Sequence, residues 1–185
     1  MNADIKKWLE KDGGQFLKEI GLKKGQTVLD FGSGAGHYTI PAAKIVGSKG
    51  KIYAFDKDKT ALSKLEEIAR QFVLKNIELI NGDTKVPLED NSMDVVLCYD
   101  VVHYMKNRAP MYDETHRVLR PEGFFSFYPK HHKDDYPLME LASLKLGAVI
   151  KEVERSGFML KDKLSIECLH DNYYNECSIL NFTLL

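Results

Sequence analysis

The sequence lacks any long apolar segment. No uninterrupted run of about 18 apolar residues occurs, and residues 1–7 are mostly polar, unlike a secretory leader. The sequence also lacks an excess of charge, because 26 lysines and arginines nearly balance 27 aspartates and glutamates. These absences argue against a membrane span, and they leave no overall field that would attract nucleic acid or an anionic membrane. We therefore expect a cytoplasmic protein.

Cysteine is scarce. The three cysteines, Cys98, Cys168 and Cys177, are odd in number and form no CxxC pair. This pattern argues against a disulfide framework and against a thiolate zinc site. Cys168, His170 and Cys177 together supply fewer than the four ligands that a structural metal site takes. We therefore expect thiols that behave as small buried hydrophobes, and no bound metal.

What is present fits one globular domain. The chain has 185 residues, of which 44% are hydrophobic and 29% charged, so it can bury a sizeable core. We see no linker, internal repeat or low-complexity segment and expect a single domain over residues 1–185. An N-terminal helix over residues 4–20, broken at Gly13 and Gly14, is expected to pack on that domain.

Strand-like and helix-like segments alternate regularly after that helix. Five short apolar segments are predicted strands, and amphipathic segments between them are predicted helices. This alternation predicts a parallel sheet with helices on both faces, which binds ligands beyond the carboxyl ends of its strands. The predicted strands are residues 27–31, 51–56, 76–81, 95–99 and 124–128, and the predicted helices are residues 36–46, 59–73 and 107–119.

The C-terminal part completes the expected fold. Helices are predicted near residues 138–146 and 149–156, followed by strands over residues 159–167 and 177–184. The expected fold class is therefore a Rossmann-like, doubly wound α/β domain. Its seven-stranded sheet is mostly parallel, with an antiparallel C-terminal strand.

A glycine-rich loop leaves the first predicted strand and opens a helix. Its sequence over residues 30–36 is DFGSGAG, and glycine lets the backbone adopt positive φ and approach a ligand closely. A dinucleotide fingerprint requires GxGxxG, but the position three after Gly34 is His37. The GxGxG spacing, preceded by an acid, therefore argues against a dinucleotide oxidoreductase.

Acidic residues end the next two predicted strands. Asp56 follows Asp30 by 26 positions and can accept hydrogen bonds from two ribose hydroxyls. Its alternative role, capping the following helix, suits Asp58 better. Asn-Gly-Asp-Thr ends the third strand, and by itself such a sequence is a common turn.

The glycine loop and these strand ends, with the turn at residues 119–123 (LRPEG), resemble the motifs of class I S-adenosylmethionine-dependent methyltransferases. The resemblance covers roughly residues 20–128. Its general look is that of the ubiquinone and menaquinone C-methyltransferases, although this chain lacks their usual length. The resemblance implies cofactor contacts by Asp30, Phe31, Gly32, Ser33, Gly34, Gly36, His37, Asp56, Lys57, Gly82, Asp83, Thr84, Tyr99 and Asp100.

Methyl transfer is an in-line displacement that needs alignment more than it needs a catalytic group. If the acceptor is a hydroxyl or a ring carbon, a base helps, and it should follow the fourth or fifth strand. His103 is the first candidate because imidazole titrates near neutral pH. Tyr104 beside it and His131 after the fifth strand are the others. Each of these three residues has a plain structural alternative, in the pocket wall or in a solvated loop.

The sequence therefore predicts an S-adenosylmethionine-dependent methyltransferase acting on a small-molecule acceptor, with S-adenosylhomocysteine as product. A protein that binds the same cofactor without transferring the methyl group is the main alternative. No NPPY motif follows the fourth strand, which argues against nucleic acid. The three cysteines leave an arsenite methyltransferase open. The oligomeric state and the atom methylated do not follow from the sequence.

Overall fold

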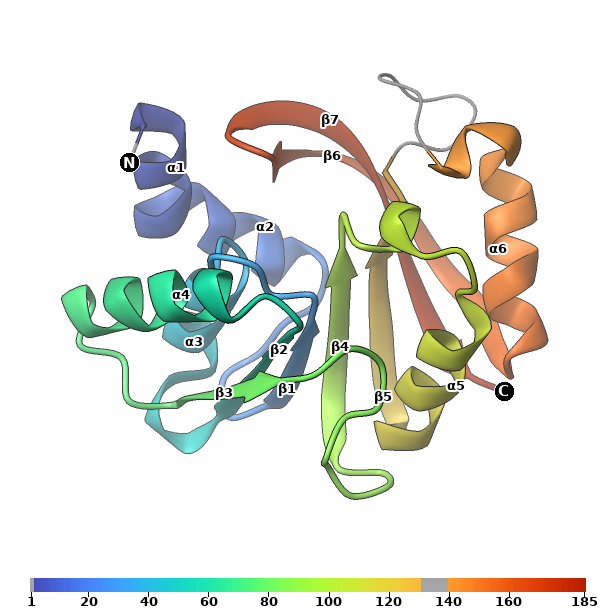
Figure 1. Cartoon of the computed structure of the whole chain (residues 1–185), viewed down its shortest axis with the longest axis horizontal. Coiled ribbons are helices and arrows are strands. Elements are labelled where there is room, and N and C mark those ends of the chain that lie inside the picture. Colours follow the sequence, from blue (N-terminus) through green and yellow to red (C-terminus); the bar gives the residue numbers. More distant parts are fainter. Residues whose placement is uncertain (1, 131–139) are drawn as a thin grey trace.

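The computed structural model describes residues 2–130 and 140–185. Its seven strands are β1 (Thr27–Phe31), β2 (Lys51–Asp56), β3 (Ile77–Asn81), β4 (Met93–Tyr99), β5 (Leu119–Tyr128), β6 (Phe158–His170) and β7 (Tyr173–Leu184). They form one sheet in the order β3-β2-β1-β4-β5-β7-β6 (Figure 1). Neighbours from β3 to β5 are parallel, and β7 is antiparallel to both β5 and β6. The predicted fold class is confirmed.

Helices cover both faces of this sheet (Figure 1). They are α1 (Ala3–Lys7), α2 (Gly13–Glu19), α3 (Thr39–Val46), α4 (Lys59–Gln71), α5 (Ala109–Val118) and α6 (Leu146–Arg155). Strand β4 shows why two layers are needed, because its side chains alternate between two buried clusters. Val95 and Leu97 join the cluster under α2, α3 and α4, whereas Val96 and Cys98 join the one under α5 and α6. Both clusters therefore form a core against the central strand.

The N-terminal helical segment is not broken at its glycines. A π-helical turn, Trp8–Asp12, links α1 directly to α2, so the predicted interruption at Gly13 and Gly14 is wrong. A Cβ atom at Gly13 would lie 2.8 Å from both Pro41 and the Trp8 ring. Close packing rather than a chain break therefore explains Gly13. The segment is tied to the domain by the Trp8 Nε1 hydrogen bond to the His37 carbonyl oxygen, 2.8 Å long.

The C-terminal strands are longer than predicted and form a hairpin around a two-residue turn, Asp171 and Asn172. The prediction stopped the first strand at residue 167 and began the second at residue 177, whereas β6 ends at His170 and β7 begins at Tyr173. This pairing brings Cys168 and Cys177 to a Cα separation of 5.8 Å, and they form a disulfide. The expectation of free thiols is thus wrong for these two cysteines and correct for buried Cys98. Counting cysteines could not reveal which of them face each other across a hairpin.

The helix predicted over residues 138–146 is also wrong over the part that the structure describes. A short 3₁₀ turn, Glu140–Ser143, is separated by two residues from α6, which begins at Leu146. The apolar spacing there belongs partly to α6, which buries Leu146, Val149 and Val153. The helix predicted near residues 149–156 is thus present as α6, which begins three residues earlier than expected.

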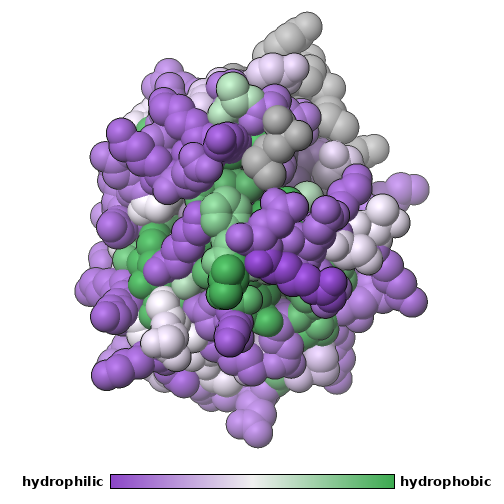
Figure 2. Space-filling model, turned by 90° about the vertical axis from the view of Figure 1, so that its left-hand side faces the viewer, coloured by the Kyte–Doolittle hydropathy of each residue, from purple (hydrophilic) through white to green (hydrophobic). Residues whose placement is uncertain are grey.

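None of the helices in residues 2–130 and 140–185 is long and apolar enough to cross a membrane. The face shown in Figure 2, which carries the N-terminal helices, is mostly hydrophilic and has a strip of hydrophobic surface between two rows of hydrophilic side chains. Apolar side chains are thus incompletely covered on this face.

Candidate functional site

A cavity of about 490 Å³ opens at the carboxyl ends of β1, β2, β3 and β4. This is the edge at which a parallel sheet is expected to bind ligands, and the volume is typical of a small-molecule site. Nine of the predicted cofactor contacts line it: Phe31, Gly32, Gly34, Asp56, Lys57, Gly82, Asp83, Thr84 and Asp100. Tyr104, one of the three candidate catalytic residues, lines it as well.

The glycine loop forms one wall of the cavity. Gly32 has φ 77° and Gly34 has φ 52°, which are left-handed conformations that favour glycine. A Cβ atom at Gly32 would lie 2.3 Å from Cγ2 of Val101, whereas one at Gly34 would meet no atom within 4 Å. Gly32 is therefore required by packing. Gly34 leaves open space on the ligand side of the loop.

Asp56 joins the glycine loop to the end of β2. Its Oδ2 accepts a hydrogen bond from the backbone N–H of Gly34 at 2.7 Å, and its Oδ1 accepts one from the N–H of Asp58 at 2.8 Å. A carboxylate offers about four acceptor positions, so these two bonds leave capacity for ligand hydroxyls. Asp58 caps α4 through the N–H groups of Thr60 and Ala61. The capping role is thus carried by Asp58, and Asp56 is left to shape the cavity.

Asp30 lies beneath the loop instead of in the cavity wall. It is only 3% exposed and accepts a hydrogen bond from the Thr39 hydroxyl at 2.5 Å. Burial raises the pKa of Asp30 to about 7, against the lowering effect of that hydrogen bond. The negative charge of Asp56 raises this pKa further. Asp30 therefore exchanges a proton close to neutral pH at the base of the site.

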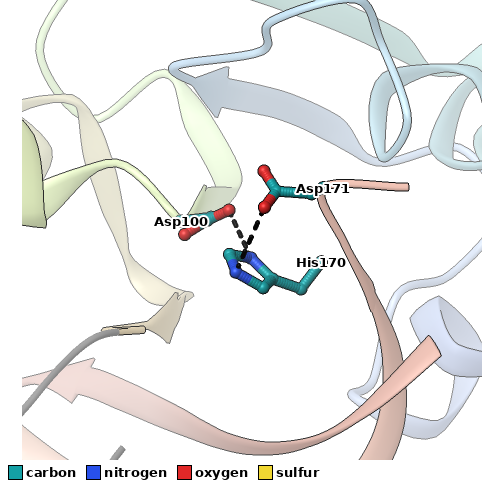
Figure 3. Close-up of side chains that lie close together, drawn as sticks. All are labelled: Asp100, His170 and Asp171. Atoms are coloured by element: carbon teal, nitrogen blue, oxygen red, sulfur yellow. Dashed lines mark hydrogen bonds and ion pairs between the residues drawn. The ribbon is translucent and has the colours of Figure 1, made fainter. Parts of the chain in front are cut away.

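Asp100 stands where β4 ends and the cavity begins. Its φ of 62° is unusual for a residue other than glycine, and such strain persists where surrounding contacts enforce it. Its Oδ2 lies 2.6 Å from Nδ1 of His170, at the end of β6 (Figure 3). Its Oδ1 lies 3.5 Å from Nδ1 of His103. Two histidines from separate elements thus approach one carboxylate in the cavity wall.

The remaining predicted site residues lie away from the described cavity lining. Ser33, Gly36, His37 and Tyr99 pack around the loop and the core, and the Tyr99 hydroxyl lies 2.6 Å from Oγ of Ser126. His103 is 1% exposed, with its ring centre 3.9 Å from that of Tyr104. His131 lies outside the described residues.

Sequence reasoning assigned Asp100, His103 and Tyr104 to the site after β4, but it did not assign the other cavity residues of this segment. Side chains between β4 and the first turn of α5 close one side of the cavity, and Val101 among them packs against Gly32 of the glycine loop. They are Val101, Met105, Lys106, Asn107, Pro110 and Met111, joined by Phe55 in β2 and Asp58 after that strand. His170 and Asp171 were also missed as site residues. They lie about 70 positions from Asp100 in the chain, and only the hairpin brings them there.

The chain resembles known proteins over most of its length. The profile of a family described as "Methyltransferase domain" matches residues 22–176. An arsenite methyltransferase from Halobacterium salinarum is 37% identical over 103 residues, which is 55% of this chain and 26% of that protein. A demethylmenaquinone methyltransferase from Staphylococcus aureus is 32% identical over 108 residues, covering 58% of this chain and 44% of that protein. The chain thus spans about a quarter to a half of the length of these two relatives.

A solved structure matches more completely. A SAM-dependent methyltransferase from Aquifex aeolicus superposes with a TM-score of 0.78 at 27% identity, covering 97% of this chain and 93% of that one. The two proteins therefore share their fold along almost the whole chain.

Proposed function

This chain belongs to the methyltransferase domain family, and we propose that it transfers a methyl group from S-adenosylmethionine to a small-molecule acceptor. One observation carries the proposal. The N–H of Gly34, in a GxGxG loop, is hydrogen-bonded to the Asp56 carboxylate at the mouth of a cavity of about 490 Å³. A ribose-binding acid and a loop that passes close to the ligand are thus held together.

The residues present fit this cofactor. The open space at Gly34 admits a ligand against the backbone, and Asp56 retains acceptor capacity for ribose hydroxyls. Asp83 and Thr84, which follow β3, line the same cavity and suit the adenine end. Gly32, in the glycine loop, and Asp100, after β4, also line the cavity and suit the methionine end. When bound, S-adenosylmethionine supplies an electrophilic methyl group.

The protein's own contribution is alignment and exclusion of water. The cavity walls come from four strand ends and from the segment before α5, so a ligand is held by several rigid elements at once. In-line transfer needs the acceptor atom, the methyl carbon and the sulfur to be collinear, which positioning alone accelerates strongly.

The acceptor is a small molecule. The relatives of this chain include an arsenite methyltransferase and a demethylmenaquinone methyltransferase, so membership of the family by itself leaves the acceptor open. The net charge of −1 offers no overall attraction for nucleic acid.

The test is calorimetric titration with S-adenosylhomocysteine. Gly34→Val fills the open space beside the loop, and Asp56→Ala removes a charged partner of the loop. Each should weaken binding by at least about tenfold, since hydrogen bonds to charged groups contribute ~1.5–3 kcal/mol. Gly25→Val is the matched control. Gly25 has φ 84° and no atom within 4 Å of a Cβ, but it lies outside the cavity, so its variant should bind normally.

Absence of binding by the wild-type protein would overturn the proposal. Binding without transfer to any acceptor, tested with radiolabelled S-adenosylmethionine, would favour the non-transferring alternative. Unchanged affinity in both cavity variants would place the cofactor elsewhere.

A further inference from the structure

Three side chains from two distant parts of the sequence lie close together (Figure 3), and one of them, Asp100, lines the cavity. Asp100 comes from the end of β4, and His170 and Asp171 come from the β6–β7 hairpin. Nδ1 of His170 lies 2.6 Å from Oδ2 of Asp100, and Nε2 lies 3.6 Å from Oδ2 of Asp171. The imidazole thus stands between two carboxylates, one in the cavity wall and one on the hairpin turn.

The geometry favours a hydrogen-bonded pair over a metal site. Ligand atoms that share one tetrahedral ion at ~2.0–2.1 Å lie more than about 3 Å apart. The separation between Asp100 and His170 is 2.6 Å, which is a short hydrogen bond. Nδ1 therefore carries the hydrogen and donates it to Asp100, and neutral His170 has its lone pair on Nε2.

The hairpin holds His170 firmly. Its side chain is 8% exposed, and its ring meets the edge of Tyr128 with centres 6.4 Å apart. The preceding carbonyl, of Leu169, accepts a 2.7 Å hydrogen bond from the Tyr38 hydroxyl. The Cys168–Cys177 disulfide lies two residues away. Asp171, on the Nε2 side, has a 71% exposed side chain, so this side of the ring is the one nearer to solvent, and Asp100 is the member of the group that lines the cavity.

We propose that His170 is the general base of the methyl transfer and that Asp100 is its positioning residue. This assignment rests on the function proposed above. As the acceptor oxygen forms its bond to the methyl carbon, the carbon–sulfur bond breaks and its electron pair stays on sulfur. The acceptor's hydroxyl proton passes to Nε2 of His170. The resulting imidazolium is stabilised by Asp100, which lines the cavity.

The surrounding charges stabilise the protonated form that His170 reaches when it accepts a proton. Burial lowers the pKa of His170, but the hydrogen bond and charge of Asp100, together with the charge of Asp171, outweigh burial and leave the pKa raised. The positive charge of Lys130, which follows β5, lowers the pKa of His170. His103, on the segment after β4, faces the same Asp100 carboxylate.

A histidine–carboxylate pair also indicates the acceptor class. A hydroxyl must lose its proton during transfer and benefits from a base, whereas a thiol that is already ionised does not. The proposed base therefore favours an acceptor that loses a proton during methylation, such as a hydroxyl group, over an ionised thiol. Phenol and thiophenol, which differ only in the attacking atom, are the matched probes.

The first experiment needs no acceptor. Nitrogen-15 NMR of the imidazole groups, recorded with S-adenosylhomocysteine, should show His170 carrying its proton on Nδ1 when neutral. Asp100→Asn should lower the pKa of His170, because it removes the neighbouring negative charge. A neutral form protonated on Nε2, or a titration unaffected by Asp100→Asn, would overturn the assignment.

The second experiment follows methylation of the two probes across pH. In the wild type, phenol methylation should rise with pH through the pKa of His170. His170→Gln should slow phenol methylation about 100-fold or more and abolish its rise with pH. The same variant should change thiophenol methylation less than about threefold. Asp100→Asn should move the rise to lower pH. His116→Gln, whose ring packs on Phe158, is the control and should behave like wild type.

The outcomes separate the two proposals. Failure to bind S-adenosylhomocysteine defeats the proposed function. Three results obtained with normal cofactor binding would defeat only the role of His170. They are an unaffected His170→Gln variant, a loss of activity in His103→Gln instead, and methylation of thiophenol alone. If the variant fails to fold, the NMR titration of wild type and Asp100→Asn still decides the matter.

Discussion

The two sides of the cavity are built in different ways. On the side of β1, β2 and β3, each wall is a short continuous stretch at a strand end, such as the glycine loop or the residues around Asp56. On the side of β4 and the hairpin, the key contact joins Asp100 to His170 across 70 positions of sequence. The first side is specified by local chain geometry. The second depends on how the C-terminal strands pack, so the two sides should respond differently to substitution.

The largest effect is expected at Gly32. Gly32→Ala places a Cβ atom 2.3 Å from Val101 in a residue with φ 77°, so both packing and backbone oppose it. The free energy of unfolding should fall by about 3 kcal/mol or more. Gly34→Ala has the backbone cost alone and should lose about 1–2 kcal/mol. Urea denaturation compares them, and equal losses would contradict the role given to Val101.

The hairpin side should be sensitive to the disulfide. Cys168 and Cys177 are 9 positions apart, and opening such a ring releases chain entropy in the unfolded state. The double variant Cys168→Ser/Cys177→Ser should therefore lose about 2–3 kcal/mol of stability. Affinity for S-adenosylhomocysteine should change less than about threefold, because neither cysteine lines the cavity. Thermal unfolding with and without a reductant checks the first expectation. A large loss of affinity would show that the two sides are coupled.

The smallest effect concerns Asp30 and its dependence on pH. Its folded pKa of about 7 lies above the value near 4 expected in the unfolded chain, so the folded state binds more protons between these values. Stability should therefore fall as pH rises, by about 2 kcal/mol between pH 5 and pH 7. Asp30→Asn should flatten this slope. Denaturation midpoints of both proteins across this pH range measure the difference, and parallel slopes would contradict the assignment.

Much of the fold could be predicted from the sequence. The apolar segments ending at Phe31, Asp56 and Asn81 became β1, β2 and β3 with little change in their boundaries. Buried parallel strands leave this signal because both their faces are covered. The prediction failed where long-range contacts decide the structure. Gly13 looks like a helix break in sequence, but it is a close contact with Trp8 and Pro41.

The sequence by itself determined where strands and helices alternate along the chain, where the glycine loop lies and which acids follow the strands. These features depend on neighbouring residues. Only the tertiary structure decided the Cys168–Cys177 disulfide and the contact of His170 with Asp100. Both depend on the register of β6 against β7 and on their placement beside β5. Pairing of distant strands is set by packing across the whole sheet, and a linear pattern of residues does not contain it.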